Sequence, residues 1–142
     1  MSKKYAFILL SNIIIFFIGI LLNTSMSLLT FIVIAYLMPI IVNNIINLTM
    51  DKTRNIKSYL LISSITTVCY FIFSLYFISR PTFENFIAEN QKDTGSITIE
   101  INSGLANIEQ LIFVFLLNFM AVFLLSLFTR KRDSDVRNQR VK

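Results

Sequence analysis

Four apolar runs, each about as long as a membrane is thick, limit how this chain can fold more than any other feature. They cover residues 5–22, 26–46, 58–79 and 105–129. A helix of about 20 residues spans a hydrocarbon core of about 30 Å. Hydrophobic residues make up 55% of the chain, which is above the usual share in soluble domains. The sequence therefore predicts an all-α membrane protein with four transmembrane helices, located in the cell membrane.

The first run has a competing interpretation, because two lysines followed by an apolar stretch also begin a secretory signal peptide. However, the run is longer than a typical signal-peptide core, and residues 23–27 lack an Ala-x-Ala cleavage site. We therefore expect residues 5–22 to remain as the first span. The short link after it predicts an antiparallel hairpin with the second span, in which Pro39 should kink the helix because it removes a backbone donor.

Charged residues predict the orientation of the spans. Basic residues dominate before the first span, between the second and third, and after the fourth, whereas residues 80–104 are acidic on balance. Basic loops stay on the cytoplasmic side of a membrane. We therefore expect both termini in the cytoplasm, an outer loop at 80–104 and a cytoplasmic basic tail at 130–142.

The basic tail begins where the fourth run ends, with Arg130, Lys131 and Arg132. Each basic residue near an anionic surface contributes about 1 kcal/mol to binding. We expect these residues to contact anionic lipid at the cytoplasmic face, or a membrane protein partner. Because topology accounts for the net charge of +5, no nucleic-acid partner is expected.

The outer loop is predicted to contain two ordered pieces. Phe83, Phe86 and Ile87 have i, i+3, i+4 spacing, which predicts a short amphipathic helix over residues 82–90 at the membrane surface. Residues 95–104 alternate apolar and polar side chains between glycines, which predicts a short strand that joins a partner's sheet or rests on lipid headgroups. The candidate recognition residues of the loop are Phe83, Phe86, Ile97, Ile99, Glu100 and Ile101.

Polar residues inside the spans allow two interpretations. Asn12 and Asn118 lie at mid-helix depth, and Ser63 and Thr67 lie on the third span. Such groups hydrogen-bond across helices for about 0.5–2 kcal/mol each. The alternative is a polar groove for a lipid headgroup or a small solute, and both interpretations stay open.

Residue types argue against the familiar intramembrane chemistries. The chain has no His and one Cys, Cys69, which leaves too few ligands for a Cys/His zinc site and no cysteine pair for redox chemistry. The first span has no carboxylate for proton-coupled export, and Glu109 lies at a helix start, where the helix dipole accounts for it. We therefore predict a protein that is not an enzyme and has no cofactor.

Short motifs in the first two spans and the outer loop resemble a known family. They are LMPII at 37–41, DKT at 51–53 and RPTFENFI at 80–87. In these motifs the chain resembles the Msa family of small staphylococcal membrane proteins, named for modulating the accessory regulator SarA. The resemblance implies a multi-span protein of the cytoplasmic membrane that influences regulator or virulence expression, and it carries no catalytic residues over.

The prediction for function is thus a non-enzymatic regulatory or accessory membrane protein. It is also motivated by the opposite charges of the outer loop and the tail. Two alternatives from other classes remain. One is a small transporter or lipid-handling subunit that uses the polar residues of the spans. The other is a bacteriocin immunity protein that meets its target through residues 80–104.

Overall fold

Four long apolar helices make up most of the computed structural model, which describes residues 3–22, 26–50, 55–93, 98–99 and 103–139. The spans are α1 (Lys3–Leu21), the continuous helix Leu28–Met50, α4 (Ile56–Ile78) and the first part of α6, Ile108–Thr129. Each is long and apolar enough to cross a membrane. In lipid, a helix satisfies its own backbone groups, which is why such runs become helices. The four predicted spans are confirmed, and the chain is a multi-pass membrane protein.

The polar residues that precede two of the spans fix where those helices begin. The side-chain oxygen of Asn55 accepts a hydrogen bond from the backbone N–H of Lys57 at 3.0 Å, at the start of α4. Ser27 Oγ accepts one from the N–H of Thr30 at 3.2 Å, at the start of the second span. Both residues have the extended backbone and oxygen-bearing side chain of an N-cap.

The second span is not a uniform α-helix. It consists of α2 (Leu28–Ile32), a π-helical turn η2 (Val33–Leu37) and α3 (Met38–Met50). The N–H of Met38 bonds to the carbonyl of Val33, five residues back. Pro39 has no N–H to donate, and a proline ring clashes with the carbonyl four residues back, so a widened turn before it accommodates the ring. The distortion predicted at Pro39 is therefore a π-helical turn on its N-terminal side.

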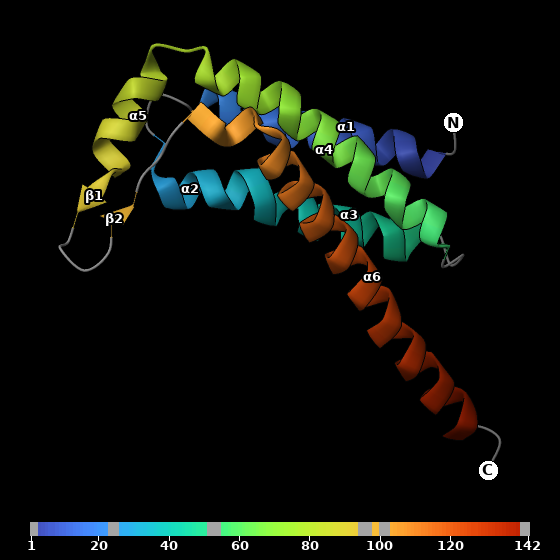
Figure 1. Ribbon diagram of the computed structural model, residues 1–142. Coiled ribbons are helices and arrows are strands. Elements are labelled where there is room, and N and C mark those ends of the chain that lie inside the picture. The colour runs from blue at the N-terminus through green and yellow to red at the C-terminus, as the bar shows by residue number, and fades with distance from the viewer. Residues whose placement is uncertain (1–2, 23–25, 51–54, 94–97, 100–102, 140–142) are drawn as a thin grey trace.

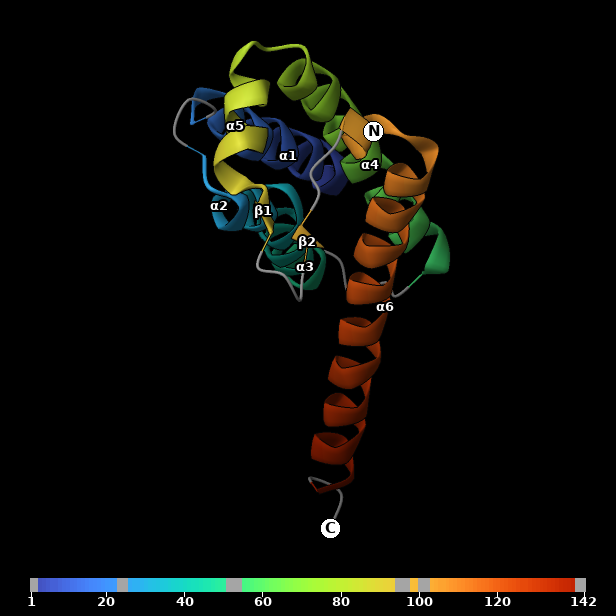
Figure 2. The same ribbon diagram turned by 60° about the vertical axis from the view of Figure 1, so that its left-hand side comes forward.

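Three spans run side by side and the fourth crosses them. Figure 1 shows α1, α3 and α4 nearly parallel, with α6 passing obliquely across α3 and α4. The C-terminal part of α6 projects beyond the others in both views (Figures 1 and 2). It continues as helix to Gln139, beyond the predicted end at 129, because residues 130–139 contain neither Gly nor Pro.

One end of the bundle carries the segment between the third and fourth spans. The predicted short helix is confirmed as α5 (Thr82–Asn90). It is followed by a two-residue antiparallel pairing of β1 (Lys92–Asp93) with β2 (Thr98–Ile99), then by the 3₁₀ turn η3 (Ser103–Ala106). We call this the α5 end. The start of α1 and the projecting part of α6 lie toward the opposite end, the N-terminal end (Figure 1).

The predicted strand at 95–104 lies largely outside the described residues. Within it, Thr98 and Ile99 face Asp93 and Lys92 in the pairing of β1 with β2. Ile97, Glu100 and Ile101 are outside the described part of the chain. This two-stranded pairing has only two residues in each strand and would be marginal on its own, so the described part of the fold is helical apart from it and the longer strand stays a prediction.

Two apolar clusters fill the interior between the spans. The larger cluster, toward the α5 end, contains the rings of Phe16, Phe31, Phe73 and Phe77. Gly19 allows close approach there, because an added Cβ would lie 3.0 Å from both Ile34 Cγ2 and Phe73 Cε2. The smaller cluster, nearer the N-terminal end, contains Ile8, Tyr59, Ile62 and Val122.

Candidate functional site

A layer of polar side chains lies at mid-height in the bundle, with one contributed by each span. Asn12 comes from α1, Asn43 from α3, Thr66 from α4 and Asn118 from α6, and each is 0% exposed. We call these four residues the polar layer. Burying an amide or hydroxyl in an apolar medium costs several kcal/mol unless it is hydrogen-bonded, so the partners of these groups decide what the layer can do.

In the polar layer each side chain donates a hydrogen bond to the next, from Asn12 on α1 to Asn43 on α3 and from Asn43 to Thr66 on α4. Thr66 Oγ1 donates to the carbonyl of Ile62 at 3.0 Å, so its oxygen is left to accept from Asn43 Nδ2 at 2.8 Å. Asn43 therefore turns its Oδ1 toward α1, where it accepts from Asn12 Nδ2 at 3.0 Å. Because the Thr66 hydroxyl donates to its own helix, it fixes the orientation of the Asn43 amide, which in turn fixes that of Asn12. These hydrogen bonds connect α1 to α3 and α3 to α4.

The fourth span joins the polar layer more weakly. Asn43 Nδ2 also approaches Asn118 Oδ1 at 3.5 Å, and Asn118 Nδ2 donates to the carbonyl of Val114 at 3.0 Å. Because hydrogen bonds weaken toward this distance, α6 is less tightly held than the other three spans at this level. Asn43 is the only described residue that bonds to the side chains of three other spans.

One acceptor in the polar layer has no partner. Asn12 Nδ2 bonds to both the carbonyl of Ile8 and Asn43 Oδ1, at 2.8 and 3.0 Å, so its Oδ1 faces away from both. That oxygen is buried without a hydrogen bond. Every other side-chain nitrogen and oxygen of the polar layer that is buried to this degree has a partner, so the layer's main chemical capacity is to hold helices together.

The predicted set of Asn12, Ser63, Thr67 and Asn118 is only partly brought together. Asn12 and Asn118 lie in the polar layer, whereas Ser63 Oγ donates to the carbonyl of Tyr59 at 2.9 Å and Thr67 Oγ1 to that of Ser63 at 2.8 Å. Both hydroxyls thus bond within their own helix. Asn43 and Thr66 were not predicted as members of the layer, and the only sequence signal for them was an uncharged hydrogen-bonding side chain inside an apolar run.

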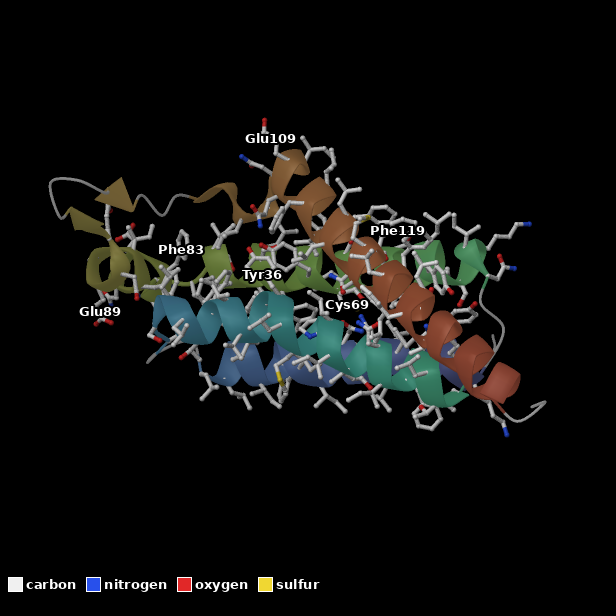
Figure 3. The ribbon with its side chains drawn as sticks, turned by 90° about the horizontal axis from the view of Figure 1, so that it is seen from below. Tyr36, Cys69, Phe83, Glu89, Glu109 and Phe119 are labelled. Atoms are coloured by element: carbon white, nitrogen blue, oxygen red, sulfur yellow. The ribbon has the colours of Figure 1, made fainter. Side chains whose placement is uncertain are left out.

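A second polar contact joins the π-helical turn to α6. Gln110 Nε2 donates to Tyr36 Oη at 2.7 Å, and Tyr36 Oη lies 3.4 Å from Tyr70 Oη on α4. Tyr36 belongs to η2, so the widened turn carries the hydroxyl that meets the start of α6. Figure 3 shows Tyr36 between its own helix and α6. No sequence pattern pointed to this contact.

The α5 helix is fastened to the bundle by aromatic rings. Phe83 and Phe86 are buried, and their ring centroids lie 5.6 and 5.2 Å from that of Phe77 on α4. Phe86 also lies 5.7 Å from the ring of Phe31 on α2. The apolar face of α5, predicted to lie on the membrane surface, therefore packs onto the ends of α2 and α4.

A hydrogen bond completes this attachment. Asn90 Oδ1 accepts from the backbone N–H of Leu28 at 2.7 Å, while Asn90 Nδ2 donates to the carbonyl of Phe86 at 2.9 Å. Leu28 is the first residue of α2, where backbone N–H groups have no partner inside the helix. The last residue of α5 therefore caps the second span from outside it.

The other face of α5 is polar and exposed. Glu84, Asn85 and Glu89 lie on it, and Figure 3 shows Glu89 pointing away from the bundle while Phe83 points toward it. Of the predicted recognition residues, Phe83 and Phe86 are thus anchors, and a partner from outside would meet the glutamate face instead. Ile99 lies in β2, and Ile97, Glu100 and Ile101 are outside the described residues.

Basic residues lie toward the N-terminal end. Arg130, Lys131 and Arg132 lie in the helical extension of α6. Lys4 is buried, and its Nζ donates to Ser58 Oγ at 2.7 Å and lies 5.5 Å from the centroid of the Tyr5 ring. This contact joins the start of α1 to the start of α4, so a lysine that the sequence suggested only as a topology signal also links two helices.

Neither the reactive side chains of the described residues nor comparison with known proteins defines a class narrower than a four-span membrane protein. Among the described residues, no group of three or more His, Cys, Asp or Glu side chains could hold a metal ion. Comparison with known proteins finds no family model, no curated protein and no solved structure that matches the chain. Arguments about function therefore rest on the polar layer, the attached α5 helix and the extended α6 helix.

Proposed function

We propose that this chain is a non-enzymatic regulatory or accessory protein of the cell membrane, which recognises a signal or partner through the α5 end and acts through the basic extension of α6. The resemblance to the Msa family supports the same proposal. In this proposal both termini lie in the cytoplasm and the α5 end lies outside, as the positive-inside rule favours for the loop charges.

The observation that carries the proposal is the attachment of α5. A loop helix that merely connects two spans does not need to cap one of them, yet Asn90 bonds to Leu28 at 2.7 Å and two phenylalanine rings lie buried beneath the helix. A ligand that shifts α5 would therefore act directly on the first turn of the second span. A partner can bind the exposed glutamate face of α5 while the opposite face, with Phe83 and Phe86, stays packed on the bundle.

A route from α5 to the basic extension exists within the bundle. The second span carries Tyr36 in its π-helical turn, and Tyr36 Oη accepts from Gln110 on α6 at 2.7 Å. From there α6 continues without a break to Gln139. Helical turns of the π type are often found at functional sites, and this one lies between the capped end of α2 and the helix that bears the basic residues.

The polar layer supports regulation or assembly better than transport. Its amides and hydroxyl bond to one another and to backbone carbonyls one turn away, and the interior between it and α5 is filled by phenylalanine rings. A path for a polar solute needs groups that stay available along the whole span. The transporter and immunity alternatives gain no comparable support from the described contacts.

Transcript profiling tests the proposal. Deletion of the gene should change the expression of a regulator or of virulence functions, and the wild-type chain should restore it. Asn90→Ala, which removes the acceptor for the Leu28 N–H, should restore expression only partly. Ser64→Ala, which removes an exposed hydroxyl that bonds only within α4, should restore it fully.

Membrane levels of both variants are measured by immunoblot, so that a loss of protein is not mistaken for a loss of signalling. Co-purification after crosslinking in native membranes tests for the partner of the basic extension. Unchanged transcripts in every growth phase, together with no crosslinked protein or anionic lipid, would refute the proposal.

A further inference from the structure

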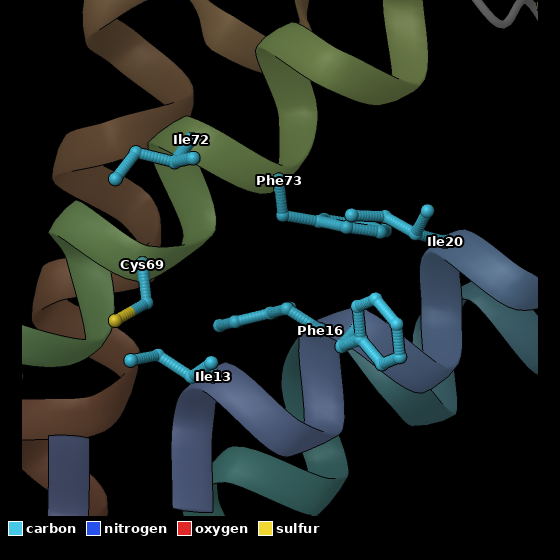
Figure 4. Close-up of a pocket in the computed structure, with 7 residues that line it drawn as sticks. Ile13, Phe16, Ile20, Cys69, Ile72 and Phe73 are labelled. Carbon is cyan, nitrogen blue, oxygen red and sulfur yellow. The ribbon is translucent and has the colours of Figure 1, made fainter. Parts of the chain in front are cut away.

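An apolar groove lies between α1 and α4. It encloses about 170 Å³ and is lined by side chains of both helices, including Ile13, Phe16 and Phe17 from α1 and Cys69, Ile72 and Phe73 from α4. Figure 4 shows Cys69 between Ile13 and Ile72, with Phe16 and Phe73 beside it. Its residues lie in the half of the spans nearer the α5 end.

The groove exists because one residue at this helix contact is small. Ile13, Phe16 and Phe17 form one face of α1 by their i, i+3, i+4 spacing, and Cys69, Ile72 and Phe73 form the facing stripe of α4. Cys69 has the shortest side chain of the six residues and leaves space between the larger side chains around it. A leucine at position 69 would occupy it.

The groove has a buried floor and an exposed rim. Phe16 and Phe73 are 4% and 1% exposed, and their stacked rings lie 5.2 Å apart, within the aromatic cluster that also holds α5. Phe17 and Ile72 are 57% and 63% exposed. In a multi-pass protein such exposed side chains contact lipid, so the groove is continuous with the lipid-facing surface of α1 and α4.

We propose that this groove is a binding site for one acyl chain of a bilayer lipid. Both helices that form it span the membrane, so the medium at its rim is hydrocarbon. An engineered apolar cavity of about 150 Å³ is known to hold benzene, so this space accommodates a chain segment of about six carbons.

The free energy for binding comes from contact and not from the hydrophobic effect. An acyl chain that leaves the bilayer for the groove exchanges one apolar surrounding for another, so only tighter van der Waals contact favours the groove. The two stacked rings of the floor and the rim side chains Phe17 and Ile72 supply this contact. We therefore expect a lipid that exchanges more slowly than its neighbours, with selectivity for chain shape and little for the headgroup.

Photolabelling with a lipid that carries a diazirine within its acyl chain tests the site. The wild-type chain is reconstituted with this lipid, irradiated, digested and mapped by mass spectrometry. We expect adducts on Cys69, although it is only 8% exposed, in addition to adducts on lipid-facing residues such as Ile14 and Val68. Adducts confined to exposed side chains would contradict the proposal.

A variant that fills the groove, compared with a matched control, provides a second test of the lipid site. Cys69→Leu should reduce, severalfold, both the adducts on Phe73 and the lipid retained after mild delipidation, as counted by native mass spectrometry. Ser64→Leu adds the same side chain to an exposed position of α4 and should change neither. Thermal unfolding of both variants shows whether each is folded, and the wild-type labelling pattern decides the question whether or not Cys69→Leu folds.

A second copy of the chain is the other candidate occupant. In that case the floor receives no lipid adduct, Cys69→Leu alters the oligomeric state, and the acyl-chain site is refuted. Unchanged lipid retention in a folded Cys69→Leu variant would refute it equally.

Discussion

Asn43 and Asn44 are adjacent residues of the same type with very different partners. Asn43 bonds to side chains of three other helices, whereas the amide of Asn44 donates only to the carbonyl of Ile40 in its own helix, at 2.8 Å. Interhelical hydrogen bonds in membranes contribute about 0.6 kcal/mol on average and up to about 2 kcal/mol. We therefore expect Asn43 to account for most of the free energy that the polar layer contributes to stability.

Asn43→Ala should lower the free energy of unfolding in bicelles by about 1–2 kcal/mol, because it removes three interhelical contacts and leaves the Asn12 amide without its side-chain partner. Asn44→Ala should change it by much less. Steric trapping or denaturation by sodium dodecyl sulfate measures both. Equal losses in the two variants would mean that the polar layer does not hold the spans together.

Gly19 is a second position where the residue type is dictated by a neighbour. A β-branched side chain there would push against Ile34 and Phe73, which an added Cβ would already approach to 3.0 Å. Gly19→Val should therefore destabilise the bundle by about 1–3 kcal/mol in the same assay. Ile18→Val, on the exposed side of the same helix, serves as the control and should have little effect.

For single polar side chains, the chemistry of each residue type explains which contacts between helices the sequence could predict. Asparagine cannot satisfy all its donors and acceptors within its own helix, so Asn12 and Asn118 were reasonable candidates for contacts between helices. Serine and threonine can bond one turn back, and Ser63 and Thr67 do so. Whether a hydroxyl also accepts across the interface, as Thr66 does, depends on helix rotation that the sequence alone does not reveal.

Among the elements, α5 is the one whose existence was predicted but whose role was not. The i, i+3, i+4 spacing of its apolar residues predicts a helix and an apolar face, and α5 spans Thr82–Asn90 as expected. The spacing does not say what the face packs against. The rings of Phe31 and Phe77 provide that surface, and although Phe77 lies just before α5 in the sequence, Phe31 lies on the distant second span.

Phe86→Ala should release α5 from the bundle, because truncation of a buried phenylalanine costs about 3 kcal/mol or more. The backbone amides of α5 should then exchange with deuterium much faster, while those of the four spans keep their protection. Glu84→Ala, on the exposed face of α5, should leave its exchange unchanged. Protection of α5 that survives Phe86→Ala would mean that the aromatic contacts do not hold it.

The second span and α6 show what run length can and cannot predict. Apolar length located both spans, because lipid requires helices with satisfied backbones. The π-helical turn was not predicted, since a proline in an apolar run indicates a distorted helix but not which form the distortion takes. The predicted end of the fourth span at 129 is confirmed, and α6 continues beyond it to Gln139 because the residues after the span favour helix.

The whole molecule is a four-span bundle, and the two regions proposed to meet partners, α5 and the extension of α6, lie toward opposite ends of it. Hydropathy and loop charge are separate signals, and the start of α1 and the end of α6 lie at the opposite end of the bundle from α5, in agreement with both (Figure 1). Loop charge favours one orientation and the bundle geometry fits either, so the direction of the whole bundle in the membrane is the claim on which every inference about partners depends.

Cysteine accessibility tests that claim most directly. In a Cys69→Ala background, Asn85→Cys places a thiol on the exposed face of α5, and Asn55→Cys places one on the exposed cap of α4 at the other end. We predict that an impermeant maleimide labels Asn85→Cys in intact cells and labels Asn55→Cys only after the membrane is permeabilised. Labelling of Asn55→Cys but not Asn85→Cys in intact cells would invert the bundle and contradict the account.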